Sequence, residues 1–130
     1  FKIDKKIDAG DICMKSNISL SGKAEDILKN IEKKAFQIIL KLSKKKKFLF
    51  KKQKGKPSFY YRRKAYQSDL SYVINKKFNE IYDFIRMLDA HNYPRAYYKK
   101  GNKRIEFSDV SLENQSVTGK FVIKKNKWKF

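Results

Sequence analysis

The sequence contains a single cysteine, a single histidine and only two prolines in 130 residues. Because Cys13 is alone, an internal disulfide and a metal site built on several cysteines are both excluded, and a reducing compartment is expected. No run of about 18 apolar residues is present, so no helix is predicted to span a membrane. Nothing at the start resembles a signal peptide. These absences predict a soluble, cytoplasmic protein with no metal site and no membrane partner.

Acidic residues are also scarce, since 13 Asp and Glu stand against 33 Lys and Arg, giving a formal net charge of +20. Such an excess is typical of nucleic-acid-binding proteins. However, 28 of the basic residues are Lys and five are Arg, whereas Arg is favoured for bidentate contacts with phosphate. Lys, Ile, Asn, Phe and Tyr fill more than half of the chain, as an AT-rich coding sequence would impose. Nucleic acid is therefore expected to bind only weakly and non-specifically.

The apolar content of 41% and the aromatic content of 15% are high enough to bury a core and to exclude low-complexity disorder. The length fits one domain or part of one. The first residue is Phe1 and not Met, and residues 1–3 read as a strand already in progress. The chain is therefore interpreted as a downstream piece of a longer protein.

The N-terminal part predicts strands at residues 1–3 and 12–20, followed by a helix at residues 23–42. In that helix apolar side chains recur every three or four positions, and Ser21 or Gly22 is expected to cap its start. A polar linker and an aromatic and basic extended stretch then follow.

A second helix is predicted to begin near Ser68 or Ser71 and to end before Asn92, because of its apolar stripe and the proline that follows. The stripe consists of Leu70, Ile74, Phe78, Ile81, Ile85 and Leu88. These residues predict the core of the C-terminal part.

Strands are predicted at residues 95–99, 103–107 and 117–123. The first two flank Gly101-Asn102, which fits a two-residue type II′ turn. The third strand is expected to turn Val117, Phe121 and Ile123 inward. Together they predict a small antiparallel sheet.

Two stretches carry a resemblance to a known family. Residues 7–12 (IDAGDI), together with residues 21–27 (SGKAEDI), resemble the Asp-x-Gly-Asp-Ile segment of the 10-formyltetrahydrofolate-dependent formyltransferases. Residues 61–107 contain YRRK, QS, IYDFIRMLDA, YPRAY and IEF in order, and this block resembles the C-terminal part of the subgroup that formylates amino sugars on nucleotide carriers. The resemblance covers most of the chain.

The resemblance implies a catalytic role for Asp8, onto which the family's Asp falls in preference to Asp11. A carboxylate there would stabilise a cationic His and help to accept protons from the attacking amine. The family's catalytic Asn and His lie upstream and are missing from this fragment, which is therefore expected to be inactive alone. His91, the one histidine, is interpreted as a surface loop residue.

Four adjacent residues, Tyr60, Tyr61, Arg62 and Arg63, are candidates for substrate binding, because aromatic rings stack on bases and guanidinium groups hold phosphates. The alternative is that they cover the core as amphipathic side chains. Arg86 is interpreted as a structural partner of Asp83 or Asp89.

The predicted fold class is α/β, consisting of the C-terminal end of a Rossmann-like formyltransferase domain (residues 1–50), a linker with a basic aromatic strand (residues 51–67) and a small α+β subdomain (residues 68–130). The resemblance implies formyl transfer from 10-formyltetrahydrofolate to the amine of a nucleotide-linked amino sugar. A methionyl-tRNA formyltransferase is the first alternative, and a non-enzymatic basic nucleic-acid-binding module is the second. A homodimer is left open.

Overall fold

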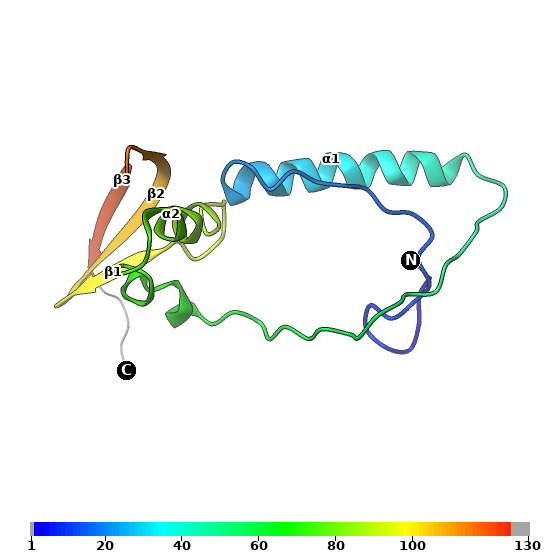
Figure 1. Cartoon of the computed structure of the whole chain (residues 1–130), viewed down its shortest axis with the longest axis horizontal. Helices are drawn as coiled ribbons and strands as arrows, with labels where there is room; N and C mark the ends of the chain where they lie inside the picture. Colours follow the sequence, from blue (N-terminus) through cyan, green and yellow to red (C-terminus); the bar gives the residue numbers. More distant parts are fainter. Residues whose placement is uncertain (1, 126–130) are drawn as a thin grey trace. The chain divides into compact units, whose positions relative to one another are not determined.

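The computed structural model describes residues 2–125 (Figure 1). The described residues divide into two units, of which the first holds residues 2–20 and 28–61 and the second holds residues 21–27 and 62–125. Within residues 2–125, none of the helices has the length and hydropathy of a membrane span. The domain boundaries predicted after residues 50 and 67 remain a prediction.

Helix α1 spans Ala24–Ser43, which confirms the helix predicted at residues 23–42. Its cap differs from the expected Ser21 or Gly22. The first helical bond runs from the Ile27 amide to the Lys23 carbonyl (3.1 Å), so Lys23 is the N-cap. The Lys23 amide donates to the Asp26 carboxylate (3.2 Å), which satisfies a backbone donor at the helix start.

The apolar stripe of α1 is largely uncovered. Ala24 and Ile27 are buried, whereas Ile31 and Ile39 are 41% and 61% exposed. The periodicity therefore predicted the helix correctly, although most of its apolar face lacks a covering layer within residues 2–125.

The strands predicted at residues 1–3 and 12–20 are not formed, and Phe1 lies outside the described residues. The only pairing in these segments of the described chain is one isolated bridge between Ile12 and Lys51. Ile3 and Leu20 are 93% and 63% exposed. A strand requires a neighbour along its length to satisfy its backbone groups, and no continuous neighbour lies beside either segment in the described residues.

The second unit contains helix α2 (Phe78–Arg86) and three strands, β1 (Tyr97–Lys100), β2 (Lys103–Glu113) and β3 (Ser116–Lys125). The strands form one antiparallel sheet in the order β1-β2-β3 (Figure 1). The predicted small α+β subdomain, a helix with an antiparallel sheet, is confirmed.

The hairpin between β1 and β2 turns at Gly101-Asn102, as predicted, because Lys100 is paired with Lys103. Gly101 has a φ of +58°, and Asn102 is not among the residues with positive φ. This is the pattern of a type II′ turn, in which only the first central residue is left-handed.

The second helix begins later than predicted. Residues Ala65–Ser68 and Leu70–Tyr72 form two short 3₁₀ turns ahead of α2. The Asp69 carboxylate accepts from the Ser71 amide (3.0 Å), and this local bond offers the backbone an alternative to the helix. Asp69 itself is extended, with φ −73° and ψ 123°, and it separates the two turns.

The core of the second unit gathers Leu70, Ile81, Ile85, Leu88 and Ala96. Four members of the predicted stripe are therefore buried, although the segment is not one helix. Ile74 and Phe78, the other two, are 46% and 47% exposed.

Val117 packs against this core, as predicted, and Phe121 lines the same apolar pocket as Val117 and Ile81, so it lies on the predicted inward face; neither Phe121 nor Ile123 is buried, however. These two side chains are 62% and 55% exposed. The nine residues of α2 give about 14 Å of helix, whereas the ten residues of β3 extend over about 33 Å. The helix is too short to cover the far end of the strand.

Replacing Ile85 by Ala is expected to lower the free energy of unfolding by about 2–5 kcal/mol, because a 3% exposed side chain leaves a cavity at the centre of the core. Urea titration followed by circular dichroism measures the loss. Ile74→Ala is the control, since the same atoms are removed from a side chain that is 46% exposed. Equal losses for the two variants would contradict this core.

Candidate functional site

Asp8 lies in a tight turn of the first unit. It adopts a left-handed backbone conformation with a φ of +54°, which Asp tolerates better than most residues. The Gln53 side-chain amide donates to the carbonyls of Asp8 (2.6 Å) and Gly10 (2.8 Å). A linker side chain therefore fixes the turn, while Asp8 itself is exposed.

Gly10 is required where this turn meets the start of the chain. A Cβ atom at this position would lie 1.7 Å from the Lys2 carbonyl oxygen, a distance that no side chain allows. The Lys2 amide donates to the Asp11 carbonyl (2.8 Å). The turn that carries Asp8 is thus held by the Gln53 side chain and by the backbone bond between Lys2 and Asp11.

Tyr60 and Tyr61, which belong to the same unit as Asp8, are 92% and 100% exposed. The alternative interpretation, in which they cover the core, does not describe these two rings. Their exposure leaves both faces available for stacking, and their role in substrate binding stays a prediction.

Arg62 and Arg63 begin the main stretch of the second unit. The Arg63 guanidinium lies 5.4 Å from the centre of the Phe84 ring, within the range of a cation–π contact, and it also donates to the Gln67 carbonyl. Arg63 therefore packs along α2 as an amphipathic side chain, whereas no contact of this kind orients Arg62, which is exposed.

Asp89 is a buried carboxylate of the second unit, 3% exposed. One carboxylate oxygen accepts from the Asp109 amide (2.7 Å) and lies 3.9 Å from the Lys23 ammonium. The other oxygen lies 3.5 Å from the Arg95 guanidinium. The sequence analysis considers Asp89 only as a partner of Arg86. The pattern that could have identified it is a carboxylate between two apolar residues, Leu88 and Ala90.

Asp109 sits at a bulge in β2, where the register with β3 shifts between Ser108 and Ser111. Its carboxylate accepts from Lys23 (2.5 Å) and from Lys120 (3.4 Å). The hydrogen bond from Lys23, followed by that from Lys120, lowers the pKa of Asp109. The bond to Asp109 in turn raises the pKa of Lys23, against a smaller effect of desolvation.

Residues Ser21–Ile27 are joined to the rest of their unit by further hydrogen bonds. The Arg86 guanidinium donates to the Gly22 carbonyl (2.6 Å) and is paired with Asp83 (2.7 Å), as one of the predicted alternatives states. The Glu25 amide donates to the Asp89 carbonyl (3.1 Å). Residues Ser21–Ile27, named the strap below, are thus held by polar contacts at several points.

The loop after α2 also contacts the strap, because the His91 amide donates to the Glu25 carboxylate (2.8 Å). His91 is exposed, which agrees with its interpretation as a surface loop residue. Cys13 is half-buried. Among residues 2–125, no group of three or more His, Cys, Asp or Glu side chains could hold a metal ion.

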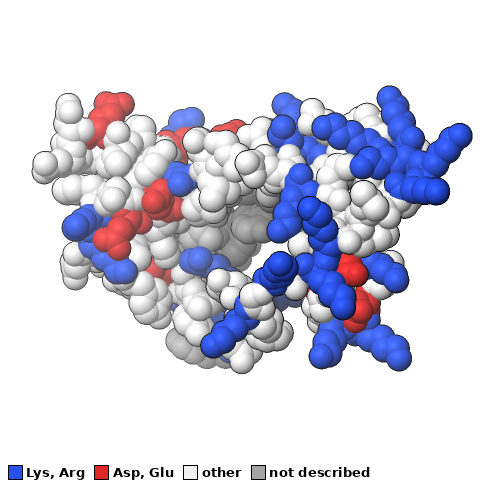
Figure 2. Space-filling view, turned by 45° about the vertical axis from the view of Figure 1, so that its right-hand side comes forward, with Lys and Arg blue, Asp and Glu red and all other residues white. Residues whose placement is uncertain are grey.

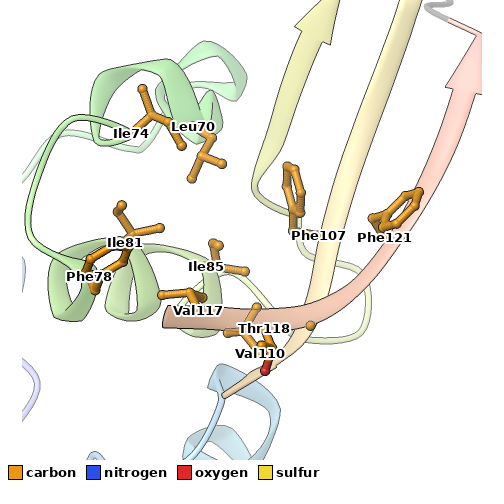
Figure 3. A pocket seen from close by; sticks show the side chains of 11 residues that line it. Leu70, Ile74, Phe78, Ile81, Ile85, Phe107, Val110, Val117, Thr118 and Phe121 are labelled. Atoms are coloured by element: carbon orange, nitrogen blue, oxygen red, sulfur yellow. The ribbon is translucent and has the colours of Figure 1, made fainter. Parts of the chain in front are cut away.

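An apolar pocket of about 340 Å³ lies between the 3₁₀ turns, α2 and the sheet (Figure 3). Its lining includes Ile74, Phe78, Ile81, Phe107 and Phe121. No ionisable side chain lines it, so the pocket offers apolar contact without acid–base chemistry.

Residues 65–124 match the family described as methionyl-tRNA formyltransferase, C-terminal domain. Among solved structures, the chain is similar to a methionyl-tRNA formyltransferase from Clostridium thermocellum, with 36% sequence identity and a TM-score of 0.85. The match covers 95% of this chain and 53% of that protein, so the chain spans about half the length of its solved relative. No match was found among curated proteins.

Replacing Asp109 by Asn is expected to lower stability in a pH-dependent way. Because the folded-state pKa of Asp109 is lowered, its contribution is present above the unfolded pKa of about 4 and is lost as the pH falls through the folded value. Asn tolerates the left-handed backbone at this position, where φ is +49°. Urea titrations from neutral to acidic pH should show the two proteins converging; a constant difference would contradict the pairing.

Proposed function

We propose that the intact protein transfers a formyl group from 10-formyltetrahydrofolate to the amine of methionyl-tRNA, because residues 65–124 match the family described as methionyl-tRNA formyltransferase, C-terminal domain. The observation that carries the proposal is the match of nearly the whole chain to a solved formyltransferase of that name. The α+β unit of this chain would then serve as the C-terminal part of such an enzyme.

The acceptor differs from the one favoured by the sequence, which was a nucleotide-linked amino sugar. Both comparisons carry the name methionyl-tRNA formyltransferase, and neither supports a sugar acceptor. Methionyl-tRNA, the first alternative, therefore becomes the proposed acceptor, and the amino sugar becomes an outcome that the experiment below distinguishes.

A long exposed stretch of the chain suits an RNA acceptor. Residues 44–64, named the basic segment, contain no Asp or Glu and are all exposed. Their basic residues are Lys44, Lys45, Lys46, Lys47, Lys51, Lys52, Lys54, Lys56, Arg62, Arg63 and Lys64. Figure 2 shows Lys and Arg side chains dominating one side of the view, with few acidic residues among them. Such a concentration of charge attracts phosphate groups through the release of counterions.

Aromatic side chains interrupt the charges of the basic segment. Phe59, Tyr60 and Tyr61 are 86%, 92% and 100% exposed. Exposed rings beside cations are the combination that holds single-stranded nucleic acid, because a base stacks on a ring while a cation contacts its phosphate. The tyrosines predicted to bind substrate would on this proposal stack on unpaired bases of the acceptor.

For the formyl transfer itself, the described residues contain one candidate catalytic group, Asp8, in its turn. The proposed role of Asp8 is to hold a cationic His and to accept a proton from the amine, as the family resemblance implies. The lining of the pocket in the second unit is apolar apart from Thr118, so it is not assigned to the donor.

The 130-residue chain alone is expected to show no formyl transfer, because the family's catalytic Asn and His have no matching positions in it. Single-turnover assays with 10-formyltetrahydrofolate and methionyl-tRNA test this. The same assay on the intact protein, with a panel of nucleotide-linked amino sugars beside methionyl-tRNA, tests the acceptor. Transfer to a sugar but not to methionyl-tRNA would overturn the proposed acceptor and leave the formyltransferase assignment in place.

Replacing Lys45 and Lys46 together by Ala is expected to weaken binding of initiator tRNA and to reduce the slope of log affinity against log salt by about 0.7–0.9 for each phosphate that is no longer neutralised. Fluorescence anisotropy at several salt concentrations measures both. Lys99→Ala with Lys100→Ala is the matched control, since these lysines are adjacent and exposed but lie on the β1 hairpin. Equal effects of both pairs would indicate the weak, non-specific binding expected from composition.

A further inference from the structure

A second pocket of the same unit adjoins the apolar one. It has a volume of about 620 Å³ and lies where the turn before α2 meets the hairpin between β2 and β3. Phe78 lines both pockets, and Leu112 of the second pocket is paired across the sheet with Val117 of the first. The two pockets are therefore neighbours, and together they are named the α2 groove.

The two ends of the α2 groove differ in chemistry. The apolar pocket has no ionisable side chain in its lining, and Figure 3 shows Phe78 and Phe121 on opposite sides of it. Beyond Phe78, the second pocket is lined by Lys76 and Lys77. Among the described residues, no Asp or Glu lines either pocket. The groove thus presents an apolar surface that ends at two cations.

The two lysines are open to an anion. Both are exposed. The Lys76 ammonium lies 3.6 Å from a Glu80 carboxylate oxygen, and the other oxygen of Glu80 accepts from the Lys77 backbone amide (3.4 Å). Because an ion pair between exposed side chains contributes little, a second carboxylate can displace Glu80 from Lys76 at small cost.

We propose that the α2 groove binds a free medium-chain fatty acid, with the hydrocarbon chain in the apolar pocket and the carboxylate at Lys76 and Lys77. The charge pattern of the groove matches that of such a molecule, which is apolar along its length and anionic at one end. The inference rests on the second unit alone and is independent of the proposed function.

The size of the apolar pocket agrees with this ligand. Its volume of about 340 Å³ falls in the range of about 300–1,000 Å³ that is typical of small-molecule sites. Along β3 its lining runs from Val117 to Phe121, and four residues of strand extend over about 13 Å. An extended medium-chain acyl group is of similar length.

The lining also favours a hydrocarbon chain over a peptide or a nucleotide. Thr118 carries the one polar side chain of the apolar pocket within the described residues, and its hydroxyl is already hydrogen-bonded to Ser111 (2.8 Å). A peptide backbone or a base edge in this pocket would lose its hydration without gaining hydrogen bonds, and this loss is costly. A chain of methylene groups needs no such partner.

A series of fatty acids tests the apolar pocket. Octanoate, decanoate and dodecanoate are titrated into the 130-residue chain by isothermal calorimetry, each below its micelle concentration. One molecule per chain is expected, and each added methylene should tighten binding by about fourfold, because burial of a methylene group contributes about 0.8 kcal/mol. No binding, several molecules per chain, or an affinity independent of chain length would overturn the proposal.

Variants at the cationic end test the placement of the carboxylate. Replacing Lys76 and Lys77 together by Ala should weaken decanoate binding by about tenfold, as expected for a lost charge-assisted contact. The matched control replaces Lys99 and Lys100 by Ala, which changes the net charge equally but lies outside both linings. Glu80→Gln should tighten binding, because it removes the competing carboxylate. Equal weakening by the two lysine pairs would show attraction to net charge alone and would overturn the proposal.

A variant at the junction of the two pockets tests whether one ligand occupies both. Phe78→Ala should weaken binding and flatten its dependence on chain length, since this ring lines both pockets. Tyr72→Ala is the control, because Tyr72 is also exposed, at 61%, and lines neither pocket. Circular dichroism confirms that both variants fold. Equal affinities for the two variants would contradict a ligand that passes Phe78.

Discussion

The carboxylate of Asp89 is the group on which the second unit depends. A charge that is 3% exposed has lost most of its hydration, and such a loss is tolerated only where hydrogen bonds and opposite charges replace the water. The Asp109 amide, Lys23 and Arg95 supply them. These three partners lie at the β2 bulge, at the start of α1 and just before β1. One buried charge therefore fixes how three separate segments meet.

Sequence periodicity predicted what local patterns can determine. The helix at residues 23–42 and the hairpin at Gly101-Asn102 follow from spacing and turn chemistry, and both are present. The predicted burial of the apolar stripe was also largely correct, because Leu70 reaches the core from a 3₁₀ turn as it would have from a helix. The resemblance to formyltransferases, which composition alone could not have indicated, agrees with the matches to formyltransferases, whereas neither match supports the amino-sugar subgroup.

The remaining features depend on partners distant in the sequence. Residues 12–20 alternate like a strand, yet a strand exists only where a neighbour pairs with it. The short helix α2 could not be foreseen, because a single side-chain bond from Asp69 competes with the helix. Asp89 was missed as the centre of its cluster, since its partners lie 66 residues before and 20 residues after it. The roles of Asp8 and of the residues from Tyr60 to Arg63 stay predictions, because no contact within the described residues assigns them a ligand.

The strap gives the chain an unusual response to proteases. The basic segment is exposed throughout and rich in lysine, so trypsin should cut it readily. A cut there separates the polypeptide into an N-terminal and a C-terminal fragment. In the strap, Lys23 is bonded to Asp109, Glu25 to Asp89 and Gly22 to Arg86. These hydrogen bonds would still hold the N-terminal fragment to the C-terminal fragment. The nicked protein would therefore migrate as one species under native conditions and as two fragments once denatured.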